Sequence, residues 1–177
     1  MKMSRVNLSD SKSSDSVNLL VSILVRFPQI GTVKIDSKKQ VLWLNFMLSQ
    51  SIEPCEIEKF QKHTTDILQA YHYVIGMDPK FLCIEAQKPY ENFFMLSIGR
   101  DISTLTREEL SLIISMLTET FMDKLLMDES GGEPDSFDDF GFPDELIDSM
   151  LENMKFQRTS TSLTALRENG RVLVFKK

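Results

Sequence analysis

Two histidines and two cysteines are the side chains of this sequence best suited to nucleophilic or acid–base catalysis. His63 and His72 are the only histidines, and their spacing of nine residues on one predicted helix points them to opposite sides of it. His72 lies beside the apolar stripe of that helix, where a histidine more often packs than catalyses. Cys55 and Cys83 lack the Cys-x-x-Cys spacing of zinc sites and give no sign of a disulfide framework. We therefore predict no catalytic residue and no metal site.

Motifs for phosphate and calcium are also missing from the sequence. The seven glycines are scattered among turn and cap positions and form no glycine-rich phosphate loop. The stretch DSFDDFG, residues 135–141, lacks the alternate-position ligand spacing of a calcium-binding loop. No cofactor is predicted. An enzyme would instead need a concave pocket around His72, with a carboxylate or Cys83 within hydrogen-bond reach.

Negative charge is concentrated in one segment of the chain. Residues 127–154 carry ten carboxylates and no basic residue, which leaves residues 1–126 nearly neutral in a chain of net charge −6. Glycine, proline and like-charge repulsion predict a flexible charged linker over 127–142. We predict that a short helix over 143–155 then docks into an apolar groove, on its own body or on a partner, through a narrow stripe formed by Leu146, Ile147, Met150 and Leu151.

Positive charge gathers at the C-terminus. Residues 155–177 contain six basic residues and one acidic residue. One interpretation is a solvated hairpin rim, and the alternative is a phosphate-contacting surface on structured RNA that includes Arg158, Arg167 and Arg171. Within this region Asn169–Gly170 is the strongest hairpin signal in the sequence, because both residues tolerate the positive φ of a type I′ turn. The two-residue loop predicts that Leu166 faces Leu173 and that Thr164 faces Phe175.

Apolar periodicity predicts the elements that must position these residues. Helices are expected over 16–27, 54–74 and 106–125, and the last of them begins at a capping box formed by Thr106 and Glu109. Alternation of apolar residues predicts two hairpins between the helices, formed by strands over 32–36, 41–48, 81–86 and 93–99.

This order predicts an α+β fold. Two β-hairpins form an antiparallel sheet packed by three helices, in the order α-ββ-α-ββ-α, and a C-terminal short helix and β-hairpin follow. The expected organisation is a flexible N-terminal tail, a core domain, an acidic linker and a helix-plus-hairpin appendage, over residues 1–15, 16–126, 127–142 and 143–177. The strand around Trp43 is apolar on both faces. Its second face should therefore be covered by another chain, by the C-terminal hairpin or by residues 143–155.

Element order gives the chain a likeness to a known superfamily. The passage ENFFMLSIGRDISTLTREELSLIISMLTETFMDKL reads as strand, capped turn and long last helix. Together with the preceding elements, over about residues 15–125, it resembles the type III secretion chaperones and their YbjN-like relatives. The resemblance implies an α+β fold, typically dimeric and without catalytic activity, that holds partner proteins through exposed hydrophobic patches. The fifty further C-terminal residues depart from that pattern.

These observations favour a protein that is not an enzyme. We predict a cytoplasmic protein-interaction or regulatory, chaperone-like module that binds a protein partner or a second copy of itself through apolar surface, with Trp43 and the 146–151 stripe in contact. The alternative is an RNA- or ribosome-associated factor that uses the basic C-terminal hairpin. No membrane segment is evident, because the first apolar run, residues 17–27, is short and interrupted by Arg26. No small-molecule substrate is evident either.

Overall fold

The central strand of the sheet carries apolar side chains on both faces. The face with the fully buried side chains is the one on which the helices pack. The computed structural model describes residues 11–49, 51–127 and 144–177. In β2 (Val41–Ser49) the side chains of Leu42, Leu44, Phe46 and Leu48 are fully buried, whereas Trp43 and Met47 are only half-buried. The first set forms the floor of the core, on which the helices lie.

Seven strands in the described residues form one antiparallel sheet, in the order β3-β4-β2-β1-β6-β7, with β5 also paired to β2. The first hairpin is β1 (Thr32–Asp36) with β2, and the second is β3 (Leu82–Tyr90) with β4 (Phe93–Asp101). The third is β6 (Leu163–Glu168) with β7 (Arg171–Lys176), and the short β5 spans Leu125–Leu126. The predicted α+β class is confirmed.

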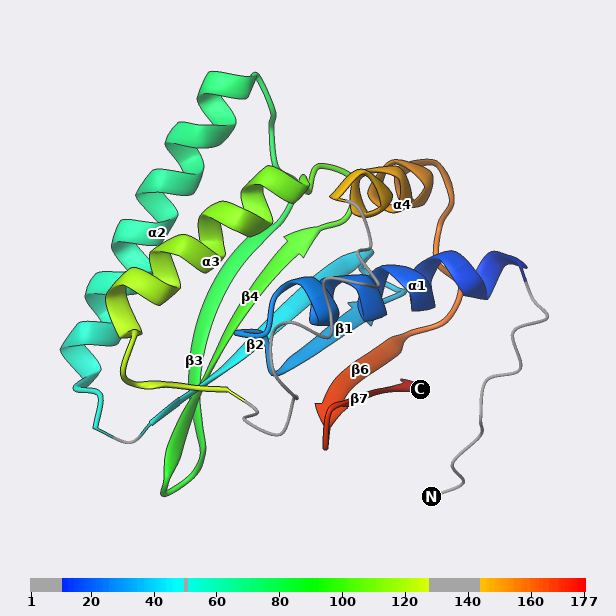
Figure 1. Ribbon diagram of the computed structural model, residues 1–177. Helices are drawn as coiled ribbons and strands as arrows, with labels where there is room; N and C mark the ends of the chain where they lie inside the picture. The colour runs from blue at the N-terminus through cyan, green and yellow to red at the C-terminus, as the bar shows by residue number, and fades with distance from the viewer. Residues whose placement is uncertain (1–10, 50, 128–143) are drawn as a thin grey trace.

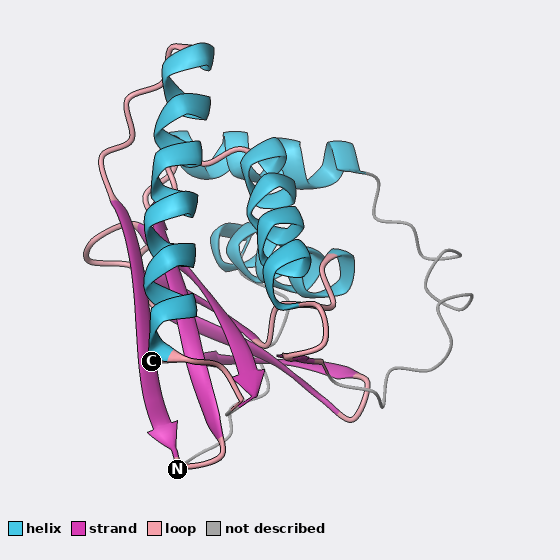
Figure 2. Ribbon diagram, turned by 90° about the vertical axis from the view of Figure 1, so that its left-hand side faces the viewer, coloured by secondary structure: helices cyan, strands magenta, loops and turns pink. Residues whose placement is uncertain are grey.

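Four helices supply the second layer (Figure 1). They are α1 (Ser11–Arg26), α2 (Pro54–Ile75), α3 (Arg107–Phe121) and α4 (Asp144–Phe156). Figure 2 shows them gathered on one side of the sheet. Local signals place their ends: Pro54 opens α2, and Gly76 closes it in the left-handed conformation at φ 66°.

Several predicted boundaries need correction. Helix α1 begins at Ser11, five residues before the predicted start, and the helix predicted to reach 125 ends at Phe121 because the chain turns there into β5. The second hairpin turns at Glu91–Asn92, so β3 is longer than predicted. Residues 1–10 of the predicted tail, and all but residue 127 of the predicted linker, lie outside the described residues.

The C-terminal helix and hairpin join the main fold, and neither covers the second face of the sheet. The register Leu166–Leu173 and Thr164–Phe175 is as predicted, with φ of 49° at Asn169 and 72° at Gly170. However, β6 also pairs with β1, so the hairpin widens the sheet edge to edge. Helix α4 packs on the helical side, where Met154 and its other buried residues belong to the same core as Leu20 of α1.

Candidate functional site

One face of the sheet carries apolar side chains with no described helix over it. Residues paired across antiparallel strands point to the same side, so the partners of Trp43 and Met47 share their face. We call this surface the open face. The apolar members that reach solvent are Trp43, Met47, Phe93, Met95, Leu126, Leu166, Leu173 and Phe175. Leu126 is exposed and the others are half-buried. Polar side chains such as Lys34, Glu85 and Thr164 share this face, so apolar and polar groups are mixed on it.

Trp43 is held in place by its neighbours on the open face. It is paired with Gly99 of β4, and a Cβ atom added to Gly99 would lie 2.8 Å from Cζ3 of Trp43 and 2.9 Å from Cε1 of Phe81. The Phe81 ring meets the indole edge-on, with centroids 5.7 Å apart and an interplanar angle of 71°. The glycine therefore provides the space in which the indole lies, and contacts within the chain alone fix the position of the ring.

Hollows lie beside the indole. One, of about 220 Å³, is lined by Trp43 together with Lys34, Asn45, Glu85, Gln87, Met95 and Ser97. A second, of about 230 Å³, lies between Trp43, Thr164 and Lys177. A large aromatic ring next to small hollows is the pattern of energetic hot spots at protein interfaces, where an anchor side chain fills a pocket.

The polar groups at the centre of the open face bond to one another. Asn45 is buried, its Nδ2 donates to Oγ1 of Thr32 at 3.0 Å, and its Oδ1 accepts from Oγ of Ser97 at 2.7 Å. Covering this row with another protein would break neither of these two hydrogen bonds, so the desolvation of the row would cost little.

Charges of opposite sign flank the same hollow. Lys34 stands on β1 beside Trp43, and Glu85 stands on β3 beside Ser97. Glu85 also accepts a hydrogen bond from Sγ of Cys83 at 3.4 Å. Burial, followed by this bond and the charge of Glu85, raises the pKa of the Cys83 thiol. Cys83 is therefore a poor nucleophile at neutral pH.

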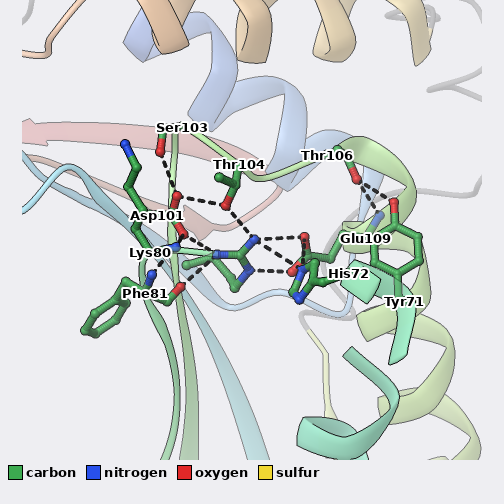
Figure 3. Close-up of polar contacts among 10 residues, drawn as sticks. Tyr71, His72, Lys80, Phe81, Asp101, Ser103, Thr104, Thr106 and Glu109 are labelled. Atoms are coloured by element: carbon green, nitrogen blue, oxygen red, sulfur yellow. Dashed lines mark hydrogen bonds and ion pairs between the residues drawn. The ribbon is translucent and has the colours of Figure 1, made fainter. Parts of the chain in front are cut away.

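Behind the open face, a buried polar network joins the sheet to α2 and α3 (Figure 3). Arg100, only 1% exposed, donates from Nε and an Nη atom to both carboxylate oxygens of Glu109, which is fully buried. Its other bonds go to Asp101, Thr104 and the carbonyl of Phe81. Burial alone would lower the pKa of the Arg100 guanidinium, but the hydrogen bonds and charges of Glu109 and Asp101 outweigh burial and raise this pKa. The network is therefore a charged, hydrogen-bonded connection between β4, α2 and α3.

Asp101 is the second carboxylate of this network. Burial alone would raise its pKa, but hydrogen bonds from Ser103, Thr104 and the Phe81 amide, together with the charge of Arg100, lower the pKa of Asp101 to about 2. Asp101 is thus ionised at neutral pH and fastens the start of β3 to the end of β4.

His72 lies inside the same network. Its Nε2 is 3.1 Å from a carboxylate oxygen of Glu109, and its Nδ1 is buried without a hydrogen-bond partner in the described structure. The same Nε2 lies 3.4 Å from Nη2 of Arg100, so it faces both an acceptor and a donor within the network. The carboxylate required by the enzyme alternative is present, but His72 is only 2% exposed. A substrate could reach the ring only after α2 or α3 moved.

The predicted partner-binding residues fall in two places. Trp43 is on the open face, whereas Ile147, Met150 and Leu151 are buried against the chain's own core, and only Leu146 of that stripe is at the surface. Salt bridges hold α4 there as well, from Arg26 to Asp144 at 2.9 Å and from Arg107 to Asp148 at 3.1 Å. In this conformation the stripe docks onto its own body.

The three arginines of the RNA alternative are dispersed. Arg167 donates to the carbonyl oxygens of Leu24, Pro28 and Ile30, around the C-terminal end of α1. Arg171 is exposed at the turn of the last hairpin, and Arg158 lines a separate pocket beyond the end of α4.

The sequence reasoning missed the network and the role of Gly99. Glu109 was predicted to complete a capping box, and Thr106 does accept from the amide of Glu109 at 3.2 Å, but the carboxylate turns inward to Arg100. The available signal was Arg100 itself, a charged residue that follows an apolar strand.

Compared with protein-family models, with curated proteins and with solved structures, the chain shows no match. Within the described residues, no helix is long and apolar enough to cross a membrane, and no group of three or more histidine, cysteine or acidic side chains is arranged to hold a metal ion.

Proposed function

We propose that this chain is a non-enzymatic protein-binding module that receives its partner on the open face of the sheet. The observation that carries the proposal is Trp43, a half-buried indole fixed over Gly99 beside two hollows, on a face that no described helix covers. Sheets that face water on one side usually carry polar residues there. The open face instead mixes half-buried apolar side chains with polar groups that are already hydrogen-bonded to one another at its centre, and this combination suits an interface.

We further propose a second copy of the same chain as the occupant. Lys34 and Glu85 lie on opposite sides of one hollow. A two-fold axis between two facing sheets, passing near Trp43, would bring Lys34 of each copy to Glu85 of the other and place the two indoles in contact. Such self-complementarity is what a symmetric dimer interface requires.

The size of the face supports this occupant. Six strands at a spacing of about 4.8 Å, each roughly 17 to 30 Å long, give a face of roughly 500 to 900 Å². A stable interface buries about 800 Å² from each partner. The resemblance to type III secretion chaperones and their YbjN-like relatives, which hold partners through hydrophobic patches and are typically dimeric, agrees with this proposal.

Sedimentation velocity over a range of concentrations tests it. We expect the wild-type protein to be dimeric and Met95→Asp to be monomeric, because an unpaired carboxylate would be buried in the interface. Val74→Asp is the control, since Val74 is 82% exposed on α2, away from the open face. A wild-type protein that stays monomeric at every concentration would rule out the second copy.

The RNA alternative has less support. Of its three arginines, Arg167 is already bonded to backbone carbonyls, and Arg158 and Arg171 belong to different surfaces. A phosphate backbone would need several free cations along one path.

A further inference from the structure

A larger pocket lies at one end of the sheet, apart from the hollows beside Trp43. Its volume is about 540 Å³, within the range of small-molecule sites. It forms where β4 ends, β2 begins and the last turn of α4 comes alongside, and Figure 1 shows the arrowhead of β4 near α4. The β1–β2 turn contributes Lys39, and the segment before β3 contributes Lys80 and Phe81. Segments far apart in the sequence thus build one concave surface.

The pocket concentrates positive charge in a chain whose net charge is −6. Four cations line it, namely Lys39, Lys80, Lys155 and Arg158. Lys155 is paired with Glu152 at 2.6 Å, but the side chains of the other three have no hydrogen bond or ion pair with any described residue. The only carboxylate in the lining, Asp101, is already held by Arg100. Gathering unpaired cations costs repulsion, which a bound anion would relieve.

Apolar and aromatic groups complete the lining. Phe156, at the end of α4, is 86% exposed, and Ile102 and Met154 contribute apolar surface. An exposed phenylalanine offers a flat face on which a planar ring can stack. The pocket therefore combines sites for negative oxygens with a site for a ring.

We propose that this pocket binds a nucleoside phosphate. Lys39, Lys80 and Arg158 take the phosphate oxygens, because they are the cations without partners, and Phe156 stacks on the base. Arginine suits phosphate through paired N–H donors, and the lysines add compact charges. The proposal is independent of the dimer, since the residues that it uses are not among those of the open face.

Calorimetric titration of the full chain with ATP, GTP, sodium pyrophosphate and a ten-nucleotide RNA tests this inference. We expect a nucleoside triphosphate to bind, with an affinity that falls as salt is raised. Lys80→Gln combined with Arg158→Gln should weaken binding about tenfold or more, because two charge-assisted contacts are lost. Phe156→Ala should weaken nucleotide binding and leave pyrophosphate binding unchanged.

A matched double variant supplies the control. Lys38→Gln combined with Arg171→Gln removes the same two residue types and the same charge from exposed positions that do not line the pocket. It should bind nucleotide as the wild type does. Equal losses in the two double variants, binding of the RNA alone, or no nucleotide binding below about 1 mM would each overturn the inference.

Discussion

At the scale of single residues, Gly99 and Trp43 work as a pair. The glycine has no Cβ, and the indole occupies the space that a Cβ would need. The position of the ring therefore depends on a glycine at residue 99. The shape of the adjoining hollows depends on it as well.

Gly99→Ala should displace the indole and destabilise the fold by about 1 to 3 kcal/mol, the usual cost of inserting a methyl group into a packed site. Trp43 is the only tryptophan, so its emission reports this site alone, and we expect a red shift as the ring moves toward water. Gly31→Ala is the comparison, because its nearest contact is the flexible Met47 side chain at 3.3 Å. Unchanged emission in Gly99→Ala would contradict the geometry.

Asp101 makes the protein sensitive to acid. Its folded pKa of about 2 lies below the ordinary value of 3.8, so its ionised form is favoured by the folded state. The contribution to the free energy of unfolding, about 2 kcal/mol, is complete above about pH 4 and is lost as the pH falls toward 2.

Asp101→Asn should therefore lower the free energy of unfolding at pH 7 by about 2 kcal/mol and make its decline between pH 4 and 2 shallower. Denaturant unfolding at a series of pH values measures both effects. The control is Asp66→Asn, a surface partner of Lys62, which should change stability by less than about 0.5 kcal/mol. An Asp101→Asn variant with the wild-type pH profile would show that the network does not hold this carboxylate.

At the scale of elements, α4 shows what a sequence pattern can and cannot determine. The apolar stripe and its acidic first turn were enough to predict the helix, which the structure places at Asp144–Phe156. The pattern could not say which surface the stripe would meet, because that surface is built by α1, more than one hundred residues earlier. Docking on the chain's own body was one of two open alternatives.

Substitutions on α4 distinguish its buried side from its exposed side. Ile147→Ala should cost about 2 to 5 kcal/mol, because it leaves a cavity at a fully buried position. Leu146→Ala, one residue earlier and 36% exposed, should cost less than about 1 kcal/mol. Chemical denaturation of the two variants measures both values, and similar losses would mean that α4 is not seated as described.

The hairpins show the same difference between contacts that a short sequence pattern predicts and contacts between distant parts of the chain. Asn169–Gly170 determines its own turn, and with it the pairing of β6 and β7, because the signal and the contact are adjacent in the sequence. The pairing of β6 with β1 involves Leu163 and Ile35, which no short pattern connects. Likewise Thr106 caps α3 as predicted, whereas the destination of the Glu109 side chain depended on a buried arginine in another element.

At the scale of the whole molecule, the described helices cover only one of the two faces of the sheet. All described helices lie on one side of the sheet, and β6 and β7 widen the sheet without covering its other side (Figure 2). That side carries the hydrogen-bonded polar row through Asn45 and the hollows beside Trp43. We propose that this open face joins two copies of the chain.

A charge-swap cycle followed by sedimentation equilibrium tests the pairing of two copies through Lys34 and Glu85. Lys34→Glu and Glu85→Lys should each raise the dimer dissociation constant about tenfold or more, because each places like charges across the interface. The double variant should dimerise nearly as well as the wild type, since both contacts are restored with their signs exchanged. If the double variant associates no better than the single variants, or the wild-type protein does not associate, the open face does not join two copies in the way proposed.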